Sequence, residues 1–233
     1  MKHLTYILLF LTLTAQGQRF KAGVHYVPHT VSTYTITAQT STYGLAAGET
    51  TSAIDASTAN CLVVGVGAGN GSVPTISDNG SHTWTHVTAC DQTSGFQVTT
   101  FFYTTGTFSS SLTVTCNGYT NIHLWAMSGV SGSPVDKTSG TIGATSNPTT
   151  TGFTPSHNGE YVFSVCTIFN NPSAPTQPTS WTANGLYSYH QFSGNEYAGG
   201  GASYLQPTSA FINPSWSYTG STITWVCSAI AIW

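Results

Sequence analysis

The stretch Leu62-Val63-Val64-Gly65-Val66 is the longest run in the chain that is typical of a strand buried on both faces. A similar run, Tyr161-Val162-Phe163-Ser164-Val165, follows much later. Strands covered on both faces lie at the centre of a fold, so we expect these two runs to organise the rest of the chain.

The tryptophans extend this similarity. With Leu62 aligned to Tyr161, two pairs of tryptophans fall at similar distances: Trp84 with Trp181, and Trp125 with Trp225. We therefore predict two half-domains of similar layout, residues 60–130 and 160–233, each led by an apolar strand and closed by a tryptophan strand. Trp84 and Trp181 are interpreted as core or inter-sheet packing because an indole buries a large area.

The pattern between these landmarks is that of short strands and turns. Ser111 to Cys116 alternates apolar and polar side chains, Asp78-Asn79-Gly80-Ser81 has the chemistry of a tight turn, and helical spacing never persists. Residues 128–156 are rich in Gly, Ser, Thr and Pro and are predicted to be mainly loop. The sequence predicts an all-β, antiparallel two-sheet sandwich, with a jelly roll as the first choice.

The N-terminus predicts export. A short positive region and the apolar segment from Tyr6 to Leu13 precede Ala15-Gln16-Gly17, which has the form of a signal-peptidase site. We expect a signal peptide over residues 1–17, followed by one β-sandwich domain over 18–233 whose lead segment, 18–59, completes a sheet edge. The product is expected to be secreted, periplasmic or at the cell surface, without membrane insertion.

The composition limits the partners. Charged residues are 5% of the chain and only four are Lys or Arg, so no basic patch can neutralise several phosphates and nucleic acid is not an expected partner. Low charge also gives little repulsion between copies, so self-association is possible.

Five cysteines enter an oxidising compartment if the chain is exported. The sequence does not choose among the possible pairings, and no Cys-x-x-Cys spacing indicates zinc. The preferred assignment is one bridge within each half: Cys90 with Cys116, and Cys166 with Cys227.

Several short phrases resemble secreted bacterial β-sandwich modules of jelly-roll or concanavalin-like shape. They are the apolar strand after Asn60-Cys61, the Asp78 to Trp84 turn and aromatic strand, Ser128-Gly129-Val130, and Pro134-Val135-Asp136. Such modules are mostly of unassigned function and often stand beside adhesive or carbohydrate-active modules. The resemblance therefore implies a fold, and it transfers no catalytic residue.

One segment is predicted to bind a ligand. Residues 186–197 lack strong strand alternation and combine aromatic rings with amides and a carboxylate. Sugars present flat C–H faces and rings of hydroxyls, which aromatic planes and polar edges recognise. The candidate contacts are Tyr187, Tyr189, His190, Gln191, Asn195, Glu196 and Tyr197, with a hairpin whose tyrosines pack on the sheet as the alternative.

Catalytic and metal chemistry find less support. No two acids have the spacing that places a carboxyl pair on one strand face, and there is no serine-hydrolase elbow, so no catalytic residue is assigned. No cofactor is expected, although Asp78 and Asp136 in oxygen-rich turns are weak calcium candidates. We predict a secreted non-catalytic module that binds a glycan or a surface polymer, so the expected partner is a polysaccharide or a cell-surface polymer. A self-assembling fibre or layer subunit is the first alternative, and a glycoside hydrolase whose acids meet only in the fold is the second.

Overall fold

The computed structural model describes residues 34–44, 48–69, 71–118, 120–169, 173–192, 195–219 and 224–233. The predicted signal peptide, residues 1–17, lies outside these residues. Within them the chain is all-β, and the only helical segment is a short 3₁₀ turn, Thr88–Cys90. No helix of the described residues is long and apolar enough to cross a membrane.

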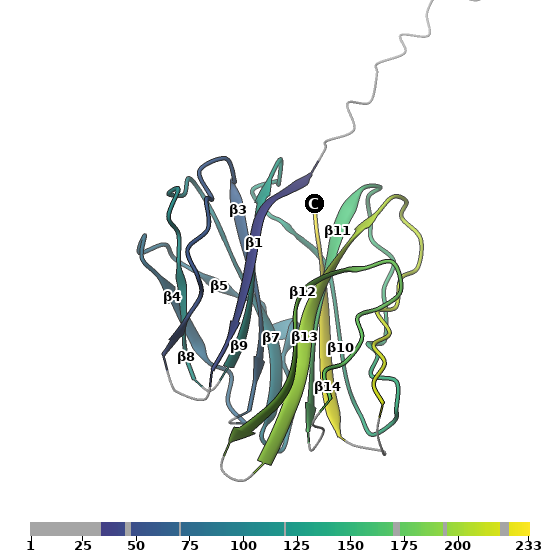
Figure 1. Cartoon of the computed structure of the whole chain (residues 1–233). Helices are drawn as coiled ribbons and strands as arrows, with labels where there is room; N and C mark the ends of the chain where they lie inside the picture. Colours follow the sequence, from purple (N-terminus) through teal and green to yellow (C-terminus); the bar gives the residue numbers. More distant parts are fainter. Residues whose placement is uncertain are drawn as a thin grey trace, which may run out of the picture. The chain divides into compact units, whose positions relative to one another are not determined.

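Two large antiparallel sheets and one small sheet make up the fold (Figure 1). The first large sheet has the order β1 (Thr35–Tyr43), β9 (Thr120–Ser128), β3 (Cys61–Ala68), β7 (Gln97–Thr105) and β5 (Thr85–His86), with β6 (Gln92–Ser94) also paired to β7. The second has the order β10 (Val135–Gly143), β14 (Trp225–Ile232), β11 (Glu160–Phe169), β13 (Asn195–Gln206) and β12 (Thr182–Phe192). The small sheet has the order β2 (Glu49–Thr50), β8 (Val114–Asn117) and β4 (Thr75–Asp78).

The predicted half-domains each form one large sheet. In both sheets the first strand of the half lies at one edge, the last strand pairs with it, and the buried apolar strand comes next. The buried strand then pairs with a later strand, β7 or β13, and an earlier strand, β5 or β12, lies beyond it. This order corrects the bounds of the halves, because each half begins one strand earlier than predicted, at β1 and at β10. The segment 128–156, predicted to be mainly loop, contains β10.

The strand register tests the predicted equivalences. Cys61 pairs with Met127 and Tyr161 pairs with Ile232, and both partners sit beside a β-bulge in the preceding edge strand. Tyr161 therefore corresponds to Cys61, one residue before Leu62. The alignment of Leu62 with Tyr161 was wrong, because a shift of one residue exchanges the two faces of a strand.

The strand register also shows which of the paired tryptophans are equivalent. Trp84 and Trp181 occupy equivalent positions. Trp84 lies two residues before His86, which pairs with Phe102, and Trp181 lies two residues before Ala183, which pairs with Ala202. Trp84 packs on the outer face of the first sheet and Trp181 on the outer face of the second, which confirms their packing role.

The closing tryptophans are not equivalent. Trp125 pairs with Val63 and lies between the two large sheets, whereas Trp225 pairs with Ile168 and lies on the outer face of the second sheet. Their similar spacing in the sequence was a coincidence.

Three apolar clusters explain why the central strands are buried on both faces. One lies between the large sheets and includes Trp125, Phe101 and Phe163. A second lies under the small sheet, and the third lies under loops that carry Trp216 and Tyr218. Every residue of β3 and of β14 is buried as a result, so these strands carry no polar face.

The sandwich prediction is thus confirmed, and the jelly-roll arrangement is not. Each large sheet comes from one continuous part of the chain, which keeps most strand pairings within a half.

Candidate functional site

The segment predicted as a binding loop is the β12–β13 hairpin. Tyr187 is 5% exposed and stacks on His123 across the sandwich, and Tyr197 is 3% exposed and packs on Phe169. These two tyrosines therefore belong to the packing, and their assignment as ligand contacts was wrong. Glycines at 199 and 201 allow this close approach, because a Cβ at Gly199 would meet the Tyr187 hydroxyl at 2.6 Å.

The remaining candidates lie near the tip of this hairpin. The side chains of Tyr189, His190, Gln191, Asn195 and Glu196 fall outside the described residues, so their ligand contacts stay predictions.

The base of the same hairpin forms a pocket with edge strand β1. This β1 pocket has a volume of about 440 Å³ and is lined by Ile36, Gln39, Tyr161, Ser180, Thr182, Ser203, Tyr204 and Leu205. It opens where β13 continues beyond its last partner in β12, Thr182. Tyr161 and Tyr204 are only partly buried there, and Gln39 is exposed, so aromatic surface and an amide face the pocket together.

A second pocket lies on the loop layer that covers the second sheet. This tryptophan pocket has a volume of about 430 Å³ and is lined by Asn147, Thr176, Gln177, Pro178, Thr179, Trp181, Asn213, Ser215, Trp216 and Ser217. Backbone hydrogen bonds between Thr176 and Ser217 hold its walls together. Its rim is made of amides and hydroxyls, which are donors and acceptors without charge.

One aromatic pair separates the two pockets. The ring of Tyr204, which lines the β1 pocket, stacks on the indole of Trp181, which lines the tryptophan pocket, with centroids 5.7 Å apart and planes 19° apart. None of the described residues that line either pocket carries a charge. The two pockets therefore suit a neutral, hydroxyl-rich ligand that is longer than one pocket.

The turn at Asp78 is fully used by the fold. Its carboxylate accepts hydrogen bonds from the backbone N–H of Gly80 at 2.6 Å and from the indole of Trp84 at 2.6 Å, and it pairs with His82 at 2.9 Å. These bonds lower the pKa of Asp78 against the effect of burial, which would raise it. The arrangement is an Asx turn that fixes Trp84, and both carboxylate oxygens already have partners.

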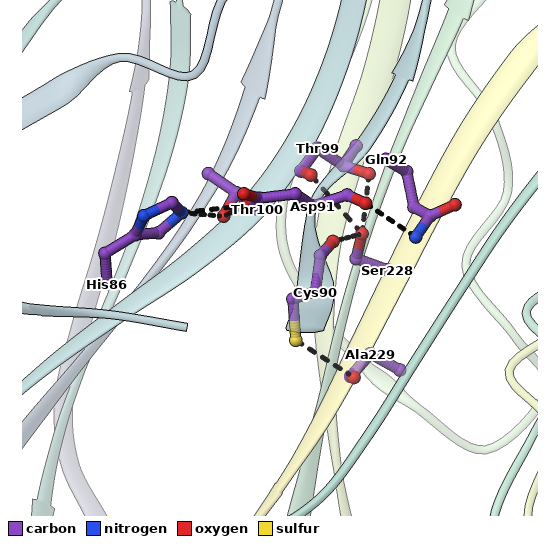
Figure 2. A network of polar contacts seen from close by, with 8 residues as sticks. All are labelled: His86, Cys90, Asp91, Gln92, Thr99, Thr100, Ser228 and Ala229. Atoms are coloured by element: carbon purple, nitrogen blue, oxygen red, sulfur yellow. Dashed lines mark hydrogen bonds and ion pairs between the residues drawn. The ribbon is translucent and has the colours of Figure 1, made fainter. Parts of the chain in front are cut away.

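A histidine and an aspartate also meet on the first sheet (Figure 2). The Nε2 atom of His86 lies 2.8 Å from Asp91 Oδ1 and 3.1 Å from the hydroxyl of Thr100, which itself donates to Asp91. A catalytic triad needs the acid on one ring nitrogen and the nucleophile on the other. Here both share one nitrogen, so the geometry is not that of a triad.

The rest of this network joins the two sheets. Ser228 of β14 donates to the carbonyl of Cys90 at 2.6 Å and bonds the hydroxyl of Thr99 of β7 at 2.7 Å (Figure 2). All three residues are buried. The network therefore satisfies polar groups inside the sandwich, where an unpaired group would be costly.

The cysteines contradict the predicted bridges. All five are buried, and none forms a disulfide bond. Cys90 lies between the large sheets whereas Cys116 lies under the small sheet, so β7 and its neighbours separate them. Cys166 and Cys227 face each other on neighbouring strands, but as hydrogen-bonded thiols. Burial raises the pKa of the Cys61 thiol to about 12, so this thiol is a poor nucleophile.

Comparison with known proteins gives no match: no family model fits the sequence, and no curated protein or solved structure is similar to it. The resemblance to secreted bacterial modules stays a prediction.

The sequence did not point to these pocket residues. The run that begins at Tyr161 predicts only a buried strand, and Gln39 stands in no distinguishing pattern. The available signal was the concentration of Asn, Gln, Ser and Thr in the loops around Asn147, Gln177 and Asn213, which composition alone does not separate from ordinary loop chemistry.

Proposed function

We propose that the protein is a secreted, non-catalytic β-sandwich module that binds a neutral glycan or another hydroxyl-rich surface polymer. The observation that carries the proposal is the pair of uncharged pockets on either side of the stacked rings of Trp181 and Tyr204. A polymer of sugar units offers repeated flat faces and hydroxyls, which match aromatic surface bordered by amides.

Acid placement supports a binding role over hydrolysis. A glycosidase needs two carboxyl groups about 5 to 9.5 Å apart on either side of an accessible bond. Among the described residues, Asp136 and Glu160 lie close together, and Glu160 is completely buried. No sugar can pass between them.

The test is retention of the full chain on insoluble cellulose, chitin, xylan and peptidoglycan. We expect retention on one polymer, weakened at least about tenfold by Tyr204→Ala and by Gln39→Ala, which truncate an aromatic and an amide of the β1 pocket. Asn213→Ala tests the tryptophan pocket in the same assay. Phe211→Ala is the matched control, because Phe211 is 65% exposed and lines neither pocket.

Two results would contradict the proposal. Failure of the wild-type chain to bind any of the polymers would remove the glycan module, and electron microscopy of the same sample would then test the self-assembling subunit. Unchanged retention by the pocket variants would show that the polymer binds elsewhere. Gln39 is exposed, so its variant remains informative if Tyr204→Ala destabilises the fold.

A further inference from the structure

Three potential metal ligands meet where β10 and β11 begin. One ligand atom each from Asp136, His157 and Glu160 lies within 4.8 Å of the others. The side chain of Glu160 is fully buried, that of Asp136 is 9% exposed and that of His157 is 45% exposed. The cluster is thus a buried carboxyl group with a histidine between it and solvent.

A β-bulge in the backbone positions Asp136. Val135 pairs with Ile232 and Lys137 with Ala231, so Asp136 is the extra residue of a β-bulge in edge strand β10. A bulge changes the direction of a side chain that would otherwise follow the strand alternation, and bulges are frequent beside functional sites. This one brings Asp136 to the start of β11.

Glu160 has an oxygen without a partner. Its Oε1 atom accepts the backbone N–H of His157 at 2.7 Å and lies 3.0 Å from His157 Nδ1. Its Oε2 atom is buried and has no hydrogen-bond donor among the described residues. Asp136 and Glu160 interact as a pair of carboxyl groups, and the hydrogen bond between them requires a proton on one of the two. A buried carboxylate in this position requires a positive partner or a proton.

The other half of the molecule shows that the fold does not need these acids. The same bulge occurs in β1 between Ile36 and Ala38, so Thr37 is the equivalent of Asp136. Asn60 is the equivalent of Glu160, and its amide forms two hydrogen bonds with the backbone of Val130 at 2.7 and 3.1 Å. The first half satisfies this position with neutral groups, whereas the second places two carboxyls and a histidine there.

We propose that Asp136, His157 and Glu160 bind one divalent transition-metal cation of the Zn²⁺ class. Two carboxylate oxygens and one imidazole nitrogen form a mixed oxygen and nitrogen set, which suits zinc and its neighbours, whereas calcium takes oxygen ligands. The cation replaces the contact between His157 Nδ1 and Glu160 and gives the buried Oε2 a partner. Water completes the coordination from the exposed side of His157.

Neighbouring groups orient the ligands. The imidazole of His157 stacks on the indole of Trp233, with centroids 4.2 Å apart and planes 16° apart, which fixes the ring. The backbone N–H of Ser156 donates to Asp136 Oδ2 at 2.6 Å, and the ammonium of Lys137 lies 3.6 Å from Oδ1. Such outer partners hold ligands in place before the ion arrives.

The test is titration of the full chain with Zn²⁺, Mn²⁺ and Ca²⁺ by calorimetry after treatment with EDTA. We expect one Zn²⁺ per chain and weak or no binding of Ca²⁺. Glu160→Gln should abolish Zn²⁺ binding, and His157→Phe, which keeps the stacking on Trp233, should weaken it at least tenfold. Asp91→Asn is the matched control, because Asp91 forms a similar pair with His86 without a third ligand.

Zinc binding that survives both substitutions would overturn the proposal, and so would a wild-type chain that binds no Zn²⁺ or prefers Ca²⁺. Absence of zinc binding would indicate that a proton shared by Asp136 and Glu160, and not a metal ion, satisfies the buried carboxyl group. His157→Phe decides the question if Glu160→Gln fails to fold, because His157 is nearly half exposed. The glycan assay involves none of these residues, so the two proposals succeed or fail separately.

Discussion

The two large sheets share one strand order and one bulge position, yet they contribute different side chains to the space between them. On β7 of the first sheet, Phe101 fills this space beside Trp125. The equivalent position on β13 of the second sheet is Gly201, which leaves room for His123 to enter from the first sheet. The repeated backbone therefore determines which positions face each other between the sheets, but not which kinds of side chain occupy them.

Truncation of Phe101 should have the largest effect on the stability of the protein. Phe101→Ala deletes a fully buried ring and leaves a cavity between the sheets, so we expect the free energy of unfolding to fall by about 3–5 kcal/mol. Urea unfolding measures this, with Phe96→Ala as the control because Phe96 is 57% exposed. Equal losses for the two variants would contradict the assignment of Phe101 to the inter-sheet core.

The contribution of His123 to the stability of the protein should depend on pH. Burial lowers the pKa of His123 to about 4, against an opposing hydrogen bond to the carbonyl of Asn184. Below about pH 6.5 His123 takes up a proton in the unfolded chain, whereas in the folded chain it stays neutral down to about pH 4. The free energy of unfolding should therefore fall on the order of 3 kcal/mol as the pH drops through this range.

The measurement for His123 is urea unfolding of the wild type and of His123→Phe at several pH values. The Phe variant keeps a ring against Tyr187 and cannot titrate, so its stability should fall less between pH 6.5 and 4. Parallel pH curves for the two proteins would show that His123 does not cause the loss.

The smallest effect concerns the equivalent positions Asn60 and Glu160. Asn60→Ala removes two hydrogen bonds to the backbone of Val130 and should lower the free energy of unfolding by about 1–3 kcal/mol. Glu160→Gln keeps the acceptor for the His157 backbone and gives Asp136 an amide donor, so in metal-free protein it should cost less than Asn60→Ala. Chemical unfolding in EDTA compares them, and the reverse order would show that Glu160 is the structural residue.

Some of these equivalent positions could be predicted from the sequence, and others could not. The runs that begin at Leu62 and Tyr161 indicate buried strands because strands covered on both faces are mainly apolar, and Trp84 and Trp181 are true equivalents. Trp125 and Trp225 misled because spacing along the chain does not report which face of a strand a side chain occupies. Residues 186–197 of the β12–β13 hairpin were predicted as a binding loop, with a packed hairpin as the alternative, because their polar and aromatic residues break the alternation. Bulges around Leu186 and Tyr187 shift the register there.

The candidate sites were harder to predict than the fold. Asp136 could be identified as an acid in a turn, but its meeting with Glu160 depends on a bulge and on the pairing of β10, β14 and β11. Tyr204 and Trp181 lie in different segments, and the register of the β12–β13 hairpin, in which Thr182 pairs with Ser203, brings their rings together.

The amino-acid sequence by itself determined the all-β class, the central strands and the division into two similar halves, because side-chain alternation and burial are local properties of a strand. Only the tertiary structure decided that each half forms its own sheet, that the five cysteines form no disulfide bond, and that two pockets and a cluster of two carboxyl groups and a histidine come together. Contacts between distant segments depend on register and on which faces oppose each other, and these are set by the packing of the whole chain.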